Sequence, residues 1–132
     1  MKHRSTTRLW LVMLSLGLFG LATAGCGGTS KPAPVAMDRA QAALKTALES
    51  WKKGDSYTAL QSQSPPIFVI DPDWEDGREL QEYQLLDEGE AKDAHMFCRV
   101  RLVVRTKSGT EQREVTYVVS TSPNLTVSRK LF

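Results

Sequence analysis

The chain has 132 residues and a formal net charge of +2, from 17 basic and 15 acidic side chains. Three of the bases precede residue 9, so the chain from Cys26 onward carries 14 basic and 15 acidic residues, a net charge of −1. A chain of this length forms a single domain with a modest core. Its near neutrality argues against a nucleic-acid partner, which would need a basic surface.

Residues 1–25 have the pattern of a signal peptide for export. Lys2, Arg4 and Arg8 give a charged start, an apolar run follows over residues 9–21, and small residues precede Cys26. The run thins out before reaching the ~20 apolar residues that a spanning helix needs, so we expect the segment to be removed after export. An uncleaved single-span anchor is the alternative.

The ending Ala24-Gly25-Cys26 resembles the lipobox of bacterial lipoproteins, although Thr23 stands where that family usually has Leu. The resemblance implies cleavage between Gly25 and Cys26 and acylation of Cys26. The partner would then be the lipid bilayer, and the protein would lie in the cell envelope, facing the periplasm or the exterior. Gly27 replaces the Asp that retains some lipoproteins in the inner membrane, which favours the outer membrane in a cell with two.

Ordinary signal peptidase is the rival, because Ala22-Thr23-Ala24 is itself an A-x-A cleavage site. Cleavage after Ala24 would release a soluble protein in which Cys26 could pair with Cys98, the only other cysteine. An acylated Cys26 leaves Cys98 without a partner. We favour the lipoprotein, because a cysteine directly after the small residues needs an explanation in a chain with only two cysteines.

Residues 26–36 contain Gly, Ser and Pro and are predicted to form a flexible linker that carries the lipid. The single domain over residues 37–132 then begins with a helix over residues 38–53, in which Ala, Leu and Trp51 recur at helical spacing. A capping box formed by Asp38 and Gln41 is expected to start this helix.

A short helix over residues 55–62 and an apolar strand over residues 67–70 follow. Four further strands are predicted at residues 80–87, 96–105, 115–119 and 125–131, with a bulge at Leu85-Leu86. Their connections are too short for parallel crossovers, so these strands are expected to be antiparallel neighbours. Ten of the acids lie within residues 71–93 and seven of the bases within residues 94–132, which predicts ion pairs across neighbouring strands.

The turn over residues 71–77 holds the most suggestive polar cluster. Its candidate binding residues are Asp71, Asp73, Trp74 and Glu75. The alternative is a turn, or one turn of helix, that Asp73 caps and Gly77 ends, with Trp74 folded onto the core. The spacing differs from that of a calcium loop, because Gly77 comes one residue too late for the sharp turn, so we expect no metal and no cofactor.

The elements predict an α+β fold, with an N-terminal amphipathic helix packed on a curved antiparallel sheet of four to five strands. Their order over residues 38–132 resembles the cone-shaped fold of nuclear-transport-factor-like and ketosteroid-isomerase-like proteins and, more loosely, of cystatins. That resemblance implies a sheet curled around a helix, often with a cavity.

No catalytic residue is assigned from the sequence. An isomerase of the cone-fold family uses an Asp and a Tyr in its cavity, and no position here matches that pair; Tyr57, Tyr83 and Tyr117 are expected in the core. His95 and Cys98 lie three apart on a strand and face opposite ways, so Cys98 is expected to be a buried, inert thiol. We expect an exported, membrane-anchored lipoprotein without catalytic activity. The alternatives are a cone-fold module that binds a small molecule or a protein, and an isomerase-like enzyme.

Overall fold

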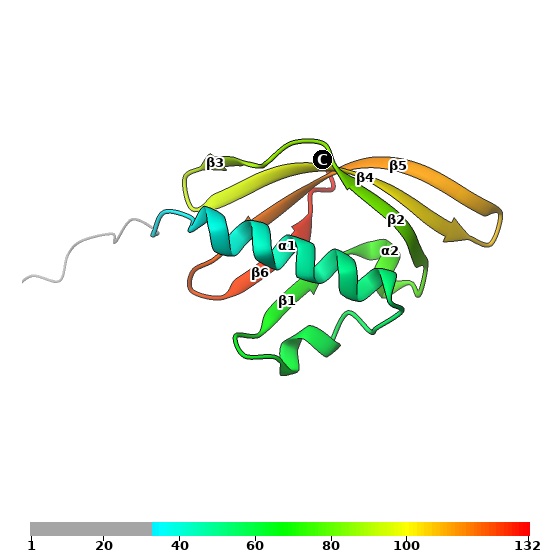
Figure 1. The fold of residues 1–132 in the computed structure, drawn as a ribbon, viewed down its shortest axis with the longest axis horizontal. Helices are drawn as coiled ribbons and strands as arrows, with labels where there is room; N and C mark the ends of the chain where they lie inside the picture. Colours follow the sequence, from blue (N-terminus) through cyan, green and yellow to red (C-terminus); the bar gives the residue numbers. More distant parts are fainter. Residues whose placement is uncertain (1–32) are drawn as a thin grey trace, which may run out of the picture. The chain divides into compact units, whose positions relative to one another are not determined.

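The computed structural model describes residues 33–132, which belong to one compact unit. The predicted signal segment, the cleavage and lipidation positions Gly25 and Cys26, and the linker up to residue 32 lie outside the described residues. The domain is α+β, with two α-helices and a mixed sheet of six strands (Figure 1). Its elements in chain order are α1 (Met37–Lys52), the 3-10 helix η1 (Ala59–Ser62), β1 (Ile67–Ile70), α2 (Pro72–Glu75), β2 (Glu79–Leu85), β3 (Glu90–Lys92), β4 (His95–Thr106), β5 (Gly109–Ser120) and β6 (Leu125–Arg129).

The apolar stripe of α1 is buried at each of the positions that the helical spacing predicted: Ala40, Ala43, Leu44, Ala47, Leu48 and Trp51. The predicted capping box is wrong. The N-cap is Ala36, and no side chain caps the helix. Polar groups at the start of the helix bond to distant residues instead. The Ala36 N–H donates to Thr121 Oγ1 (3.0 Å), and Gln41 Nε2 donates to the carbonyl oxygen of Glu88 (2.7 Å).

The strands follow the order β1-β6-β5-β4-β2 across the sheet, and β3 pairs with β4. The prediction of an antiparallel sheet of four to five strands is wrong in two respects. The segment Glu90–Lys92, which lies between two of the predicted strands, forms the sixth strand, and β1 pairs with β6 in parallel. Short turns dictate the direction of strands that follow one another, whereas β1 and β6 lie far apart in the chain and their pairing is free of that constraint.

The edge strands β1 and β2 lie at opposite ends of the strand order, yet only residues 71–78 connect them. This segment contains α2, and its Asp73 contacts Arg113 on β5 and Arg129 on β6. The connection therefore passes over β5 and β6 on its way between the two edges. The bulge of β2 lies between Leu80 and Glu82 rather than at Leu85-Leu86, because the register against β4 shifts there.

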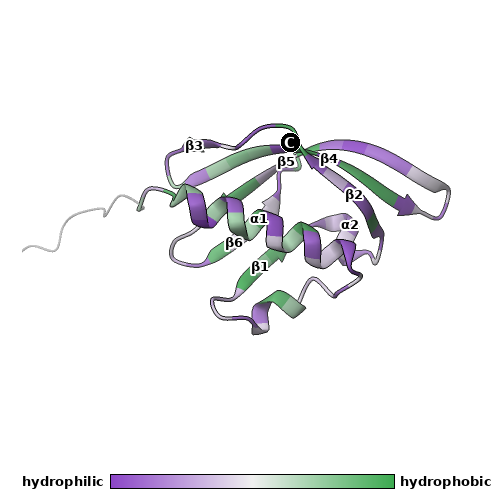
Figure 2. Ribbon diagram, viewed as in Figure 1, coloured by the Kyte–Doolittle hydropathy of each residue, from purple (hydrophilic) through white to green (hydrophobic). Residues whose placement is uncertain are grey.

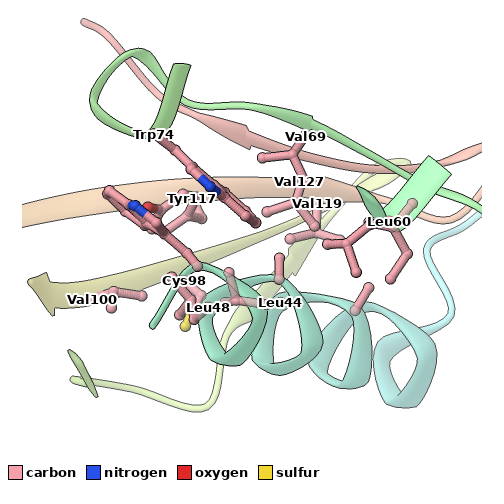
Figure 3. Packing of buried hydrophobic residues seen from close by; sticks show 14 of the residues in the cluster. Leu44, Leu48, Leu60, Val69, Trp74, Cys98, Val100, Tyr117, Val119 and Val127 are labelled. Carbon is pink, nitrogen blue, oxygen red and sulfur yellow. The ribbon is translucent and has the colours of Figure 1, made fainter. Parts of the chain in front are cut away.

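Side chains on one face of the sheet pack with side chains of α1, η1 and α2 in a single hydrophobic core. We call this face of the sheet the inner face. On β4 the inner side chains are Met96, Cys98, Val100, Leu102 and Val104, each at most 2% exposed. Trp74 of α2 stacks on Trp51 of α1, with ring centroids 5.6 Å apart and an interplanar angle of 12°. Figure 3 shows the helix side chains and the strand side chains meeting in this cluster.

The outer face carries the side chains that alternate with the inner ones. The predicted ion pairs across strands are confirmed here: Arg105 on β4 lies 3.4 Å from Glu79 on β2, and Arg99 on β4 lies 3.8 Å from Glu114 on β5. Apolar strand segments and hydrophilic ones are both visible in Figure 2. Exposed pairs of this kind contribute at most about 1 kcal/mol each.

Candidate functional site: a buried carboxylate and guanidinium cluster

The turn after β1 is built around the side chain of Asp71. Its Oδ1 accepts hydrogen bonds from the backbone N–H groups of Asp73 (3.0 Å) and Trp74 (3.3 Å), and Pro72 occupies the first helical position. Asp71, not Asp73, is therefore the N-cap of α2, because a proline directly after the cap favours helix entry at that point. Gly77, with φ +79°, follows the helix and ends it, as the sequence predicted.

The second carboxyl oxygen of Asp71 accepts a 2.5 Å hydrogen bond from the hydroxyl of Tyr117 on β5. Each of these two residues is only 1% exposed. Burial and the neighbouring Asp71 carboxylate raise the pKa of Tyr117 well above its ordinary value, so the hydroxyl keeps its proton. Asp71 is fully occupied by donors from its own turn and from the sheet.

Asp73 collects three guanidinium groups from three parts of the chain. Arg113 Nη1 lies 2.7 Å from both of its carboxyl oxygens, and Arg78 and Arg129 each donate to it as well. Burial on its own would raise the pKa of Asp73, but the hydrogen bonds from Arg129 and Arg78 outweigh it and hold the pKa below 3.8. The cluster therefore keeps Asp73 ionised.

Arg129 joins the two carboxylates. Its side chain is 7% exposed, and its Nη2 lies 2.9 Å from Asp71 Oδ1. Neither Nη2 nor Nε of Arg129 has a partner in good hydrogen-bond geometry, and the guanidinium lies 6.0 Å from the ring centroid of Tyr117. The Coulombic attraction of Asp71 and Asp73 and the ring of Tyr117 take the place of those hydrogen bonds.

An open cleft of about 620 Å³ lies beside the cluster. Arg78 and Arg113 form part of its lining, together with the β4–β5 turn and the segment between α2 and β2. Asp73 contacts both of these arginines from the buried side, while their side chains are 38% and 31% exposed. The cleft thus presents guanidinium groups that an internal carboxylate holds in place.

The structure separates the four residues that the sequence singled out. Asp71 and Asp73 share the buried cluster, whereas Glu75 is exposed. Trp74 packs in the core, and its Nε1 donates to the carbonyl oxygen of Asp55 (2.8 Å), so the alternative of a tryptophan folded onto the core is confirmed for this residue.

Sequence reasoning missed Arg78, Arg113, Tyr117 and Arg129 as members of the cluster. The alternation of residues along the strands could have identified two of them. Arg113 is in phase with the inward-facing Val115, Tyr117 and Val119, and Arg129 is in phase with Leu125 and Val127. A guanidinium on the apolar side of a strand requires a buried acid, and the turn at residues 71–73 supplies two.

The remaining chemical candidates stay apart from this cluster. His95 is exposed while Cys98 is buried, as their spacing predicted. Burial and the nearby Asp87 raise the pKa of the Cys98 thiol to about 12, so it is protonated and unreactive at neutral pH. Within residues 33–132, no group of three or more His, Cys, Asp or Glu side chains is placed to hold a metal ion.

Comparisons with protein-family models, with curated proteins and with solved structures give no significant match to this chain. Among the described residues, no helix combines the length and the apolar character that crossing a bilayer requires.

Proposed function

We propose that the chain is an exported lipoprotein that is held on a membrane of the cell envelope through acylated Cys26 and carries a non-catalytic α+β domain. The observation that carries this proposal is the order of features along the chain. A charged start, an apolar run and Ala24-Gly25-Cys26 are followed by a short Gly-, Ser- and Pro-containing segment and then by the folded domain. Two or more acyl chains on Cys26 would hold the domain at the bilayer without a spanning helix.

The non-catalytic part of the proposal is supported by the state of the buried cluster. Asp71 and Tyr117 resemble the acid and phenol of an isomerase-like site, but both are 1% exposed and bonded to each other. Asp73 is occupied by three guanidinium groups. A general base must reach its substrate with a free lone pair, so the cluster acts as a clamp that ties the turn after β1 to β5 and β6.

We propose that α1 packs across a curved sheet in the manner of the cone-shaped folds. The support is that residues 71–78 are sufficient to join the two edges of the sheet, which a strongly curved sheet makes easier.

A second candidate is a binding module, and the observation that favours it is the open cleft. Its lining includes Arg78, Arg105, Lys107 and Arg113 alongside Asp76, Glu79 and Glu111, which suits a small charged molecule better than an apolar one. Of these, Lys107 lies on the β4–β5 turn, outside the buried cluster. Lys107→Glu should weaken the binding of an anionic ligand and strengthen that of a cationic one without changing stability, and calorimetric titration with the wild type as the reference measures it.

Intact-mass analysis of the protein purified from its own host tests the anchor. We expect a first residue of Cys26 with added acyl mass, and we expect Cys26→Ala to leave the membrane fraction. Cys98→Ala is the matched control, because its thiol is buried, and it should remain at the membrane. A free amino terminus at Gly25, or an intact Met1, would contradict acylation.

A further inference from the structure

The outer face of the sheet contains a region without charged side chains, which lies on strands β1, β6 and β5. Cross-strand registers place Ile70, Ser128 and Val118 in one row and Phe68, Thr126 and Ser120 in the next, on strands β1, β6 and β5. These six side chains form what we call the uncharged patch. Phe97 of β4, opposite Val118, extends the first row.

The patch is open to solvent and contains the most exposed large apolar side chains of the strands. Ile70 is 53% exposed and Phe68 is 37% exposed. Farther along the same face, toward the β4–β5 turn, the rows contain Arg99, Arg101 and Arg105 of β4 and Glu114 of β5. Charge is therefore concentrated toward the β4–β5 turn and absent from β1, β6 and β5 at the other end, where the charged side chains Glu90 and Lys92 lie on β3, opposite Phe97 and His95 of β4.

The uncharged patch lies at the end of the sheet at which the anchor segment joins the domain. The Ala36 N–H donates to Thr121 Oγ1 (3.0 Å), and Thr121 directly follows Ser120 of the patch. In Figure 1 the start of α1 lies at the same end of the sheet as β3, while the β4–β5 turn lies at the opposite end. Val35 already packs against the core, so the tether from Cys26 ends there. Its nine residue steps span at most about 30 Å.

We propose that the uncharged patch rests on the lipid bilayer that holds Cys26, so that the domain lies against the membrane with its outer face instead of hanging freely from the tether. This inference rests on the proposed lipid anchor. A short tether at the patch end keeps the patch within reach of the bilayer. Lowering apolar and hydroxyl side chains into the interface costs far less than lowering charged ones.

Basic side chains border the patch in positions that suit lipid headgroups. Lys130 follows β6, and its ammonium lies 5.9 Å from the ring centroid of Phe97. Lys92 of β3 pairs with His95 of β4, in the row that contains Ser120. Lysine side chains can lay their stems on apolar surface and extend their ammonium groups to phosphates. We expect anionic vesicles to strengthen the contact.

The test compares two labelled positions on the same face of the acylated full-length protein. Ser128→Cys lies in the patch, and Gln112→Cys is the matched control on the outer face of β5 near the hairpin turn. Cys98 is buried and will not take the label. With a fluorescent thiol label in phosphatidylcholine vesicles containing phosphatidylglycerol, iodide should quench position 128 at least threefold less than position 112. Brominated lipid should quench position 128 more.

Ile70→Asp should restore iodide access at position 128, and Thr110→Asp, at the far end of the same face, should not. Equal iodide access at both positions while the protein still sediments with vesicles would overturn the inference and leave the anchor intact. Shielding that disappears when the protein-to-lipid ratio is lowered tenfold would assign the patch to a second copy of the chain and also overturn it. If Cys26 carries no lipid, a hexahistidine tag placed at residue 26 binds the protein to nickel-chelating vesicles in place of the anchor. The same comparison of quenching at positions 128 and 112 then tests the inference.

Discussion

The hydroxyl of Tyr117 on β5 and the carboxylate of Asp71 before α2 form a 2.5 Å hydrogen bond between two residues that are each 1% exposed. The bond joins a turn at one edge of the sheet to a strand in its middle. Because water cannot replace either partner at this depth, the pair is a strong constraint on where the segment between β1 and β2 crosses the sheet.

Tyr117→Phe removes the donor and leaves Asp71 Oδ2 buried without it. We expect a loss of about 1–3 kcal/mol in the free energy of unfolding, measured by urea denaturation. Tyr83→Phe is the matched control, because its hydroxyl bonds Glu49 (2.5 Å) at an exposed position. That change should cost less than about 1 kcal/mol. Equal losses for the two variants would contradict the structural role of the buried pair.

Asp73→Asn removes the charge that balances three guanidinium groups. We expect a loss of about 3–5 kcal/mol at neutral pH, because breaking a buried ion pair leaves its partners uncompensated. Glu75→Gln, two residues along the same helix and exposed, should change stability by no more than about 0.5 kcal/mol. A small effect of Asp73→Asn would mean that Arg78, Arg113 and Arg129 find other partners.

The pH dependence of the same variant gives an independent check. The folded protein holds the pKa of Asp73 below 3.8, so the unfolded chain binds a proton more readily. The stabilisation is therefore complete above the unfolded pKa and is lost as the pH falls through the folded one. The difference in stability between wild type and Asp73→Asn should be largest at neutral pH and shrink steadily below pH 3.8. A difference that stays constant on acidification would contradict an ionised Asp73.

Gly89→Ala tests how closely the loop after β2 approaches the core. Gly89 has φ +91°, and a methyl group there would lie 2.6 Å from Met96 Sδ, whose residue is fully buried. We expect a loss of about 2–4 kcal/mol from backbone strain and overpacking together. Gly109→Ala is the control for strain alone, because Gly109 has φ +122° and nothing within 4 Å of the added atom. Thermal unfolding of both variants separates the two contributions.

Elements with a local signal could be predicted from the sequence. The burial of Ala40 through Trp51 follows from a repeat of 3.6 residues, and the inner side of β4 from Met96 to Val104 follows from a repeat of two. These periods come from backbone geometry, so any structure that buries the apolar side must respect them. The pattern of residues 1–26 from which we predict export is local in the same sense, and export itself stays a prediction.

The contacts between elements that lie far apart in the sequence could not be predicted in this way. The parallel pairing of β1 with β6 and the strand at Glu90–Lys92 depend on which strands lie side by side in the folded chain. The convergence of Arg78, Arg113 and Arg129 on Asp73 joins a turn and two strands. No local period encodes such a meeting, because its energy comes from charges that become neighbours only when the whole chain has folded.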